Sequence, residues 1–143
     1  MYSFDSQYRV CYGDTDRMGV VYYGNYPRFY EIGRTDMIRE IYKSYRLLEE
    51  EDRIFLPARS LQINYHKPAY YDELLTIRTI VKEMPKVKFT LFSEIYNDAG
   101  DLINEGKVVL AFMDFRTGRP CKIPDRFEEI LRDKLGNNQS NRR

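Results

Sequence analysis

Apolar and polar residues alternate with two different periods along this chain, and these periods divide it into strands and helices. From Gln7 to Tyr12, apolar and aromatic residues occupy every second position, which is typical of a half-buried strand. Residues 13–24 then form a loop. From Asn25 onwards the apolar residues recur every three or four positions. This spacing predicts a helix whose buried stripe consists of Tyr26, Phe29, Tyr30, Gly33, Met37 and Ile41.

The predicted helix has clear start signals and one unexpected glycine. Asn25 is a suitable N-cap, and Pro27 lies in the first turn, where a missing N–H costs nothing. Gly33 lies on the buried stripe, although Ala would be the better helix former. We therefore expect another backbone to approach the helix at Gly33, with the helix packed tightly against a sheet.

Four further runs have strand character and follow a charged connector at 49–53. They cover residues 61–66, 74–82, 87–96 and 102–115, and a hairpin turn is expected at 97–100, Asn-Asp-Ala-Gly. Pro124 opens a short amphipathic helix with apolar residues at 127, 130, 131 and 135. Residues 1–135 are thus predicted to form a single domain, followed by a disordered tail at 136–143.

The order of these elements predicts the fold class. One strand, one long helix and then successive strands with short connections imply antiparallel pairing and an α+β protein. A single curved antiparallel sheet wrapped around the helix would account for the buried stripe and for Gly33. Such a sheet leaves its edge strands open, so self-association is expected.

Composition and charge narrow the classes of partner. The chain has 143 residues, and 23 Lys and Arg against 22 Asp and Glu leave a net charge of +1. Nucleic-acid binders usually show a basic excess or a basic stripe, so that class is disfavoured. We find no secretory leader and no apolar stretch of about 20 residues that would insert into a membrane. These features predict a cytoplasmic protein.

The side chains available for chemistry are few. His66 is the single histidine, and an exposed position on its strand is the simplest interpretation. No cysteine or histidine spacing matches a zinc site, and no glycine-rich loop matches a phosphate or dinucleotide template. A calcium loop also fails, because Met18 stands where that loop needs an oxygen ligand and Asn25 stands where it needs a bidentate Glu. We expect neither a metal nor an organic cofactor.

One segment remains, and it permits two interpretations. Gly13-Asp14-Thr15-Asp16-Arg17-Met18-Gly19 can be a turn in which both aspartates accept bonds from nearby backbone N–H groups. Alternatively, its carboxylates lie just before a helix start, where free N–H groups and positive potential stabilise an oxyanion. A carboxylate that attacks an acyl carbon or activates water would then support acyl transfer.

The same residues resemble a known family. The run from Tyr12 to Tyr26, with Glu31 and Arg34 after it, is similar to the opening of hotdog-fold acyl-CoA thioesterases of the 4-hydroxybenzoyl-CoA thioesterase-like family, which includes a Tol-Pal-associated group. Residues 65–69, Tyr-His-Lys-Pro-Ala, resemble its second strand and turn. The resemblance covers about residues 6–115 and implies a long helix wrapped by an antiparallel sheet.

Site residues follow from this resemblance by position. Asp16 resembles the catalytic carboxylate, as nucleophile or general base, and the backbone N–H of Tyr23 resembles the oxyanion donor. Asp14 is expected to organise the loop. The Tol-Pal-associated group often has His at the position of Tyr23, whereas the hydroxybenzoyl-CoA enzyme has Tyr there, so the subgroup stays open.

The resemblance also implies substrate contacts and an assembly. Tyr22, Asn25 and Tyr26 are expected on the acyl side, although aromatic residues at helical spacing are more often plain core. Lys86 and Lys88 are expected to meet the phosphates of CoA, with Arg119 and Lys122 as weaker candidates. The family implies a homodimer at least and often a homotetramer, with each active site at a subunit interface.

Three functions stay open at this stage. The leading hypothesis is an acyl-CoA thioesterase, and its variant uses acyl carrier protein as the carrier of the acyl group. A non-catalytic acyl-binding hotdog module is the alternative from another class, but it would not need Asp16. A hydroxyacyl dehydratase ranks last, because such sites use a histidine and His66 lies outside the motif.

Overall fold

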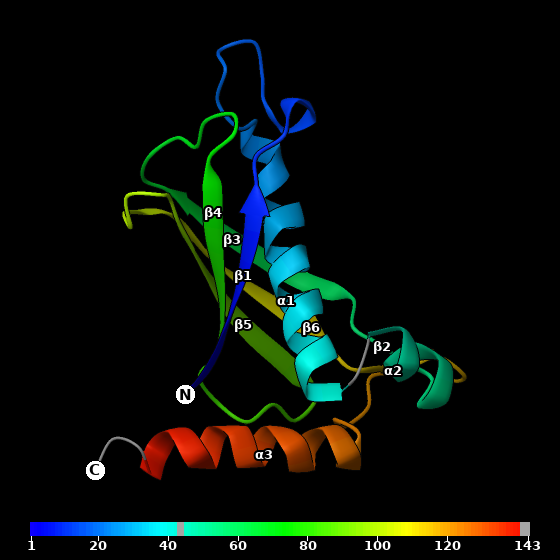
Figure 1. Cartoon of the computed structure of the whole chain (residues 1–143). Helices are drawn as coiled ribbons and strands as arrows, with labels where there is room; N and C mark the ends of the chain where they lie inside the picture. The colour runs from blue at the N-terminus through cyan, green and yellow to red at the C-terminus, as the bar shows by residue number, and fades with distance from the viewer. Residues whose placement is uncertain (43–44, 141–143) are drawn as a thin grey trace.

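The computed structural model describes residues 1–42 and 45–140, and it contains one long helix on a five-stranded antiparallel sheet (Figure 1). The strands lie in the order β1-β4-β5-β6-β3. Their bounds are Tyr2–Arg9 for β1, Ala58–Tyr65 for β3, Leu74–Val81 for β4, Lys88–Tyr96 for β5 and Leu102–Ala111 for β6. The predicted α+β class and the hotdog arrangement are confirmed.

Helix α1 (Tyr26–Tyr42) follows a short 3₁₀ turn, η2 (Tyr23–Asn25), and lies across the inner face of the sheet. Every residue of the predicted stripe is buried. A Cβ at Gly33 would lie 2.6 Å from Oγ1 of Thr79 and 2.7 Å from Cγ2 of Ile77. The expected tight packing is therefore confirmed, but the close neighbours are side chains of β4 and not a backbone.

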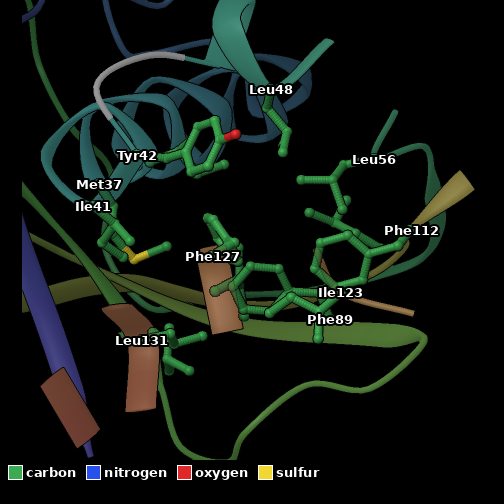
Figure 2. Close-up of a cluster of buried hydrophobic side chains, with 14 of the residues drawn as sticks. Met37, Ile41, Tyr42, Leu48, Leu56, Phe89, Phe112, Ile123, Phe127 and Leu131 are labelled. Atoms are coloured by element: carbon green, nitrogen blue, oxygen red, sulfur yellow. The ribbon is translucent and has the colours of Figure 1, made fainter. Parts of the chain in front are cut away.

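One part of the core lies between α1 and α3 (Asp125–Ser140), and we call it the α3 core. Figure 2 shows Phe127 and Leu131 of α3 pointing towards Met37 and Ile41 of α1. The ring of Phe127 meets those of Phe89 and Phe112 edge-on, at centroid distances of 5.9 and 6.1 Å. This region is held together by apolar packing.

A second cluster, which we call the motif core, lies at the opposite end of α1. It includes Val10, Val21, Tyr26, Phe29 and Leu75, and it lies beneath the loop that carries the aspartates. The two clusters meet at a row of small and polar residues across the sheet, where Ser93 of β5 pairs with Thr79 and Gly106. Gly106 leaves room for the ring of Tyr30, whose hydroxyl donates to Oδ1 of Asn104.

Several element boundaries differ from the sequence prediction. Strand β1 begins at Tyr2, five residues before the expected start, because buried residues alternate from there although the polar Ser6 interrupts the apolar pattern. The connector at 49–53 mostly belongs to a helix, α2 (Tyr45–Glu51), which Leu48 anchors in the α3 core. The many charged residues of α2 made this segment look like a connector in the sequence, although Leu48 gives the helix a buried side.

The C-terminal part also differs. The run 102–115 divides after Ala111, because the chain leaves β5 and pairs residues 113–114 (β7) with residues 54–55 (β2). The turn at 97–100 is confirmed, with Gly100 at φ +82°. Helix α3 continues to Ser140, through the predicted start of the tail at Gly136, since one glycine costs a helix only about 1 kcal/mol. Residues 141–143 lie outside the described residues.

Residues 1–42 and 45–140 contain neither a membrane-spanning helix nor a cluster of metal-binding side chains. None of the helices there is both long enough and apolar enough to cross a bilayer. The same part of the chain has no group of three or more His, Cys, Asp or Glu side chains placed to hold a metal ion.

Candidate functional site

The loop with the two aspartates folds back on itself as a tight hairpin before it enters the helix. Thr15 and Val21 form an antiparallel bridge. The N–H of Tyr22 donates to the carbonyl of Asp14 at 2.9 Å, and the N–H of Asp16 donates to the carbonyl of Val20 at 2.9 Å. This pairing fixes Asp16 near the tip of the hairpin and leads the returning strand directly to the helix start.

Asp14 holds this hairpin in place from below. Its side chain is 4% exposed and accepts hydrogen bonds from the Tyr8 hydroxyl at 2.7 Å, from the Cys11 N–H at 2.8 Å and from the Arg28 guanidinium. Burial and the bond to Asp14 raise the pKa of Tyr8. The side chain of Asn25 donates to the Asp14 carbonyl at 2.8 Å. The predicted role of Asp14 as loop organiser is confirmed.

Asn25 differs from its predicted role as N-cap. The helical segment begins earlier, at Tyr23, and Tyr22 at its N-cap makes no side-chain hydrogen bond to the helix. Because the Asn25 side chain is engaged with the loop backbone, it ties the hairpin to the helix. The sequence missed this because the 3₁₀ turn has no sequence signal of its own.

Asp16 is half-buried and keeps part of its carboxylate available. Its Oδ1 accepts the N–H of Met18 at 2.8 Å, which makes a local turn bond. Within the described residues, Oδ2 has no hydrogen-bond partner. The two aspartates therefore differ: three donors saturate Asp14, whereas Asp16 retains a free oxygen.

The helix start offers N–H groups without protein partners. In the part of the chain that the structure describes, the N–H groups of Tyr23 and Gly24 donate to no protein acceptor, as is usual in the first helical turn. Tyr23 is 65% exposed. The aligned peptides of α1 add positive potential at this end. The arrangement suits a group that becomes negatively charged.

A hollow of about 350 Å³ lies beside this turn. Its walls include Val21, Tyr23, Tyr26, Tyr65 and Pro68. Of the predicted acyl-side residues, Tyr26 lines the hollow, whereas Tyr22 and Asn25 do not. Burial raises the pKa of Tyr26, against a hydrogen bond with the Ala69 backbone that lowers it. Tyr26 is therefore a neutral wall at ordinary pH.

The neighbouring strand supplies a residue that the sequence did not assign to the site. Tyr65 contributes its ring to the hollow, and its hydroxyl donates to the carbonyl of Tyr23 at 2.9 Å. The only signal was its place beside the Lys-Pro-Ala turn. His66 also borders the hollow, is partly exposed as predicted, and lies 3.5 Å from Oε1 of Glu105.

The predicted phosphate-binding lysines do not join this cluster within one chain. Strand β1 pairs Arg9 with Leu74 at one end and Tyr2 with Val81 at the other. The hairpin follows Arg9, whereas Lys86 and Lys88 follow Val81, so they lie at opposite ends of the sheet (Figure 1). Arg119 and Lys122, between β7 and α3, also lie outside the cluster. Sequence distance alone gave no indication of this separation.

Comparison with known proteins identifies the family. Residues 10–131 match the thioesterase-like superfamily. The chain belongs to this family.

Relatives and solved structures agree with this membership. The chain is 34% identical over 116 residues to the acyl-CoA thioester hydrolase YbgC of Escherichia coli O6:H1, covering 81% of this chain and 86% of that protein. It is 36% identical over 131 residues to the acyl-CoA thioesterase YbgC of Helicobacter pylori, covering 86% and 96%. A DHNA-CoA thioesterase from Staphylococcus aureus superposes with a TM-score of 0.84 at 28% identity, covering 98% and 93%. The resemblance and the predicted class of enzyme, a thioester hydrolase, are confirmed.

Proposed function

We propose that this thioesterase-like protein hydrolyses an acyl-CoA thioester to the free acid and CoA at the helix start beside Asp16. The observation that carries this proposal is the pairing, within the described residues, of a carboxylate that has a free oxygen with a helical turn whose first two N–H groups, those of Tyr23 and Gly24, have no protein acceptor. The names of the relatives, which specify acyl-CoA, support the choice of carrier.

The proposed reaction needs only the chain, the substrate and water. In one route, Asp16 attacks the thioester carbonyl carbon, the C–S bond breaks, and water then hydrolyses the mixed anhydride. In the other, Asp16 accepts a proton from the attacking water. In both, CoA leaves as a thiolate and takes up a proton. The negative charge on the carbonyl oxygen is stabilised by the N–H of Tyr23.

The proposed acyl pocket is the hollow beside the turn. Tyr23 and Tyr26 would form its aromatic walls, with Tyr22 at the rim because it is 46% exposed and packs against Tyr23 at 4.8 Å. We assign Asn25 to support of the hairpin, since its side-chain N–H already binds the Asp14 carbonyl. Direct contact between Asn25 and substrate is therefore not part of the proposal.

We further propose that a second copy of the chain completes the site. Strand β3 lies at an edge of the sheet, and all of its residues except Ile63 are exposed, unlike those of the other edge strand, β1. Antiparallel pairing of two β3 strands would place Tyr65 of one copy beside Ala58 of the other. This edge would also be removed from solvent.

That pairing would bring the lysines to the site from the other subunit. Ala58 pairs with Leu110, and Leu110 with Phe89, so Lys88 lies two strands away from Ala58. Across a β3–β3 junction, a neighbouring lysine would then lie three strand spacings, or about 15 Å, from Tyr65. The extended arm of CoA spans such a distance, so Lys86 and Lys88 remain our proposed phosphate contacts. Dimerisation is the minimum assembly that this site requires.

A hydrolysis screen with a matched pair of variants tests the function. Wild-type protein is assayed by thiol release on short, long and aromatic acyl-CoAs and on an acyl carrier protein thioester. Asp16→Asn keeps the size and the Met18 bond but removes the nucleophile and base, so turnover should fall at least about a hundredfold. Asp36→Asn, on a carboxylate of α1 that pairs with Arg39, is the control.

Melting temperature should stay level or rise in Asp16→Asn, because active-site carboxylates are often held at a cost to stability. A folded Asp16→Asn protein that still hydrolyses its best substrate at near the wild-type rate would refute the assignment. Binding without hydrolysis by the wild-type protein would instead indicate an acyl-binding module.

A further inference from the structure

Pro27 removes one of the two N–H donors that a specific backbone carbonyl could meet at the helix start. In an α-helix, the N–H of each residue donates to the carbonyl four residues earlier. Pro27 has no N–H, and the carbonyl four residues earlier is that of Tyr23. This carbonyl opens the 3₁₀ turn that carries the proposed oxyanion donor, so the N–H of Tyr26, three residues later, is the one helical donor that it has.

Tyr65 supplies the missing donor from outside the helix. Its hydroxyl lies 2.9 Å from the Tyr23 carbonyl oxygen. Its ring packs edge-on against Tyr26, with centroids 5.4 Å apart, and against Tyr23 at 6.5 Å. Tyr65 is nevertheless 50% exposed and comes from the edge strand β3, 42 residues along the chain. Tyr65 therefore serves this position in two ways: its hydroxyl donates to a backbone carbonyl, and its ring packs against other aromatic rings.

From this geometry we infer that Tyr65 is a positioning residue, which replaces the N–H that Pro27 lacks and fixes the Tyr23 peptide for catalysis. The inference rests on the proposed function. The Tyr23 carbonyl and the Gly24 N–H belong to one peptide plane, so holding the carbonyl also sets the direction of that N–H. A peptide that accepts a hydrogen bond at its carbonyl also donates more strongly through its N–H.

Two consequences follow for the reaction. The carbonyl of Tyr23 is kept turned towards β3, and the N–H of Gly24 is kept aimed beside the proposed donor N–H of Tyr23, where a developing oxyanion would be bound. Loss of the hydroxyl should therefore weaken stabilisation of the transition state more than binding of the ground state. Tyr65→Phe should lower kcat about three- to tenfold, the range for one neutral hydrogen bond, with KM changed less than twofold.

The experiment uses Tyr65→Phe, which keeps the ring, and Tyr70→Phe as a matched exposed control. The full-length proteins are compared in kcat and KM on the best acyl-CoA, in melting temperature and in oligomeric state. The amide NMR signal of Gly24 is recorded without substrate and should shift in Tyr65→Phe but not in Tyr70→Phe. This signal does not depend on activity. If the Gly24 amide shifted in Tyr65→Phe but the wild-type protein hydrolysed no thioester, the proposed function would be overturned and the hydrogen bond from Tyr65 to Tyr23 would stand.

Rescue by a second substitution gives the decisive result. Pro27→Ala restores the N–H four residues after Tyr23, so the double variant Tyr65→Phe/Pro27→Ala should recover most of the lost kcat, and Pro27→Ala alone should stay close to wild type. A kcat loss that Pro27→Ala does not rescue would overturn the positioning role. So would an unchanged kcat in Tyr65→Phe, or a loss that merely follows a lower melting temperature.

Discussion

The two ends of helix α1 are held by different kinds of interaction. At its C-terminal end, the α3 core is an apolar cluster in which Phe127 packs edge-on against Phe89 and Phe112, and these two rings stack on each other. At its N-terminal end, the hairpin is held by hydrogen bonds to the side chain and carbonyl of Asp14. The aromatic rings of the α3 core are buried, whereas three tyrosines beside the helix start, Tyr22, Tyr23 and Tyr65, are 46%, 65% and 50% exposed.

This contrast indicates that the α3 core mainly serves the stability of the fold, whereas the hairpin also serves the proposed reaction. Apolar packing tolerates small rearrangements but gives no fixed direction to a reacting group. Hydrogen bonds from several donors do fix direction, which a carboxylate beside an oxyanion site requires. We therefore expect substitutions in the α3 core to affect unfolding and those around the hairpin to affect both unfolding and rate.

The largest effect should come from emptying the α3 core. Phe127→Ala removes a ring that is 0% exposed, and we expect the free energy of unfolding to fall by about 3–5 kcal/mol. Urea titration measures this change. Below the transition, kcat per folded molecule should match wild type. A selective loss of kcat in the fully folded variant would contradict the separation of the two ends.

Asp14→Asn should weaken the other end by a smaller amount. The substitution keeps the shape but removes the charge that pairs with Arg28, and we expect a loss of about 2–3 kcal/mol in unfolding free energy. Unlike Phe127→Ala, it should also lower kcat, because the hairpin that carries Asp16 loosens. Urea titration and steady-state kinetics on the same sample check both. A rate loss with wild-type stability would assign Asp14 to the chemistry instead.

A third prediction concerns the lysines at the far end of the sheet. Lys86→Ala/Lys88→Ala should raise KM for acyl-CoA roughly five- to tenfold, because charge-assisted phosphate bonds are lost. An acyl-pantetheine thioester, which lacks the nucleotide, should be hydrolysed as before. Equal losses on both substrates would mean that these lysines do not contact the nucleotide.

The smallest effect concerns alkaline pH. Burial and the hydrogen bond to Asp52 raise the pKa of Tyr42, in the α3 core, to about 12 from 10.0. Because the unfolded chain loses this proton first, the stability due to the Tyr42 hydroxyl is complete below pH 10 and declines as pH rises towards 12. The difference in unfolding free energy between wild type and Tyr42→Phe should therefore shrink over that interval. If the difference in unfolding free energy stayed constant between pH 10 and pH 12, the assignment of this pH dependence to the Tyr42 hydroxyl would be refuted.

Local pattern was sufficient for much of this protein. The period of the apolar residues predicted the long helix and its buried stripe, because a helix on a sheet must bury one face. Gly33 predicted tight packing, and the ordered motif around Asp16 predicted the family and the class of enzyme. These features depend on neighbours within a few residues, so the sequence determined them by itself.

Long-range contacts decided the rest. The bond from Tyr65 to the Tyr23 carbonyl and the bond from Asn25 to the Asp14 carbonyl join residues that are 42 and 11 positions apart in the sequence. The separation of Lys86 and Lys88 from the hairpin follows from the direction of β1 and β4. Strand pairing and hydrogen bonds between distant residues have no local period, so only the tertiary structure places these groups.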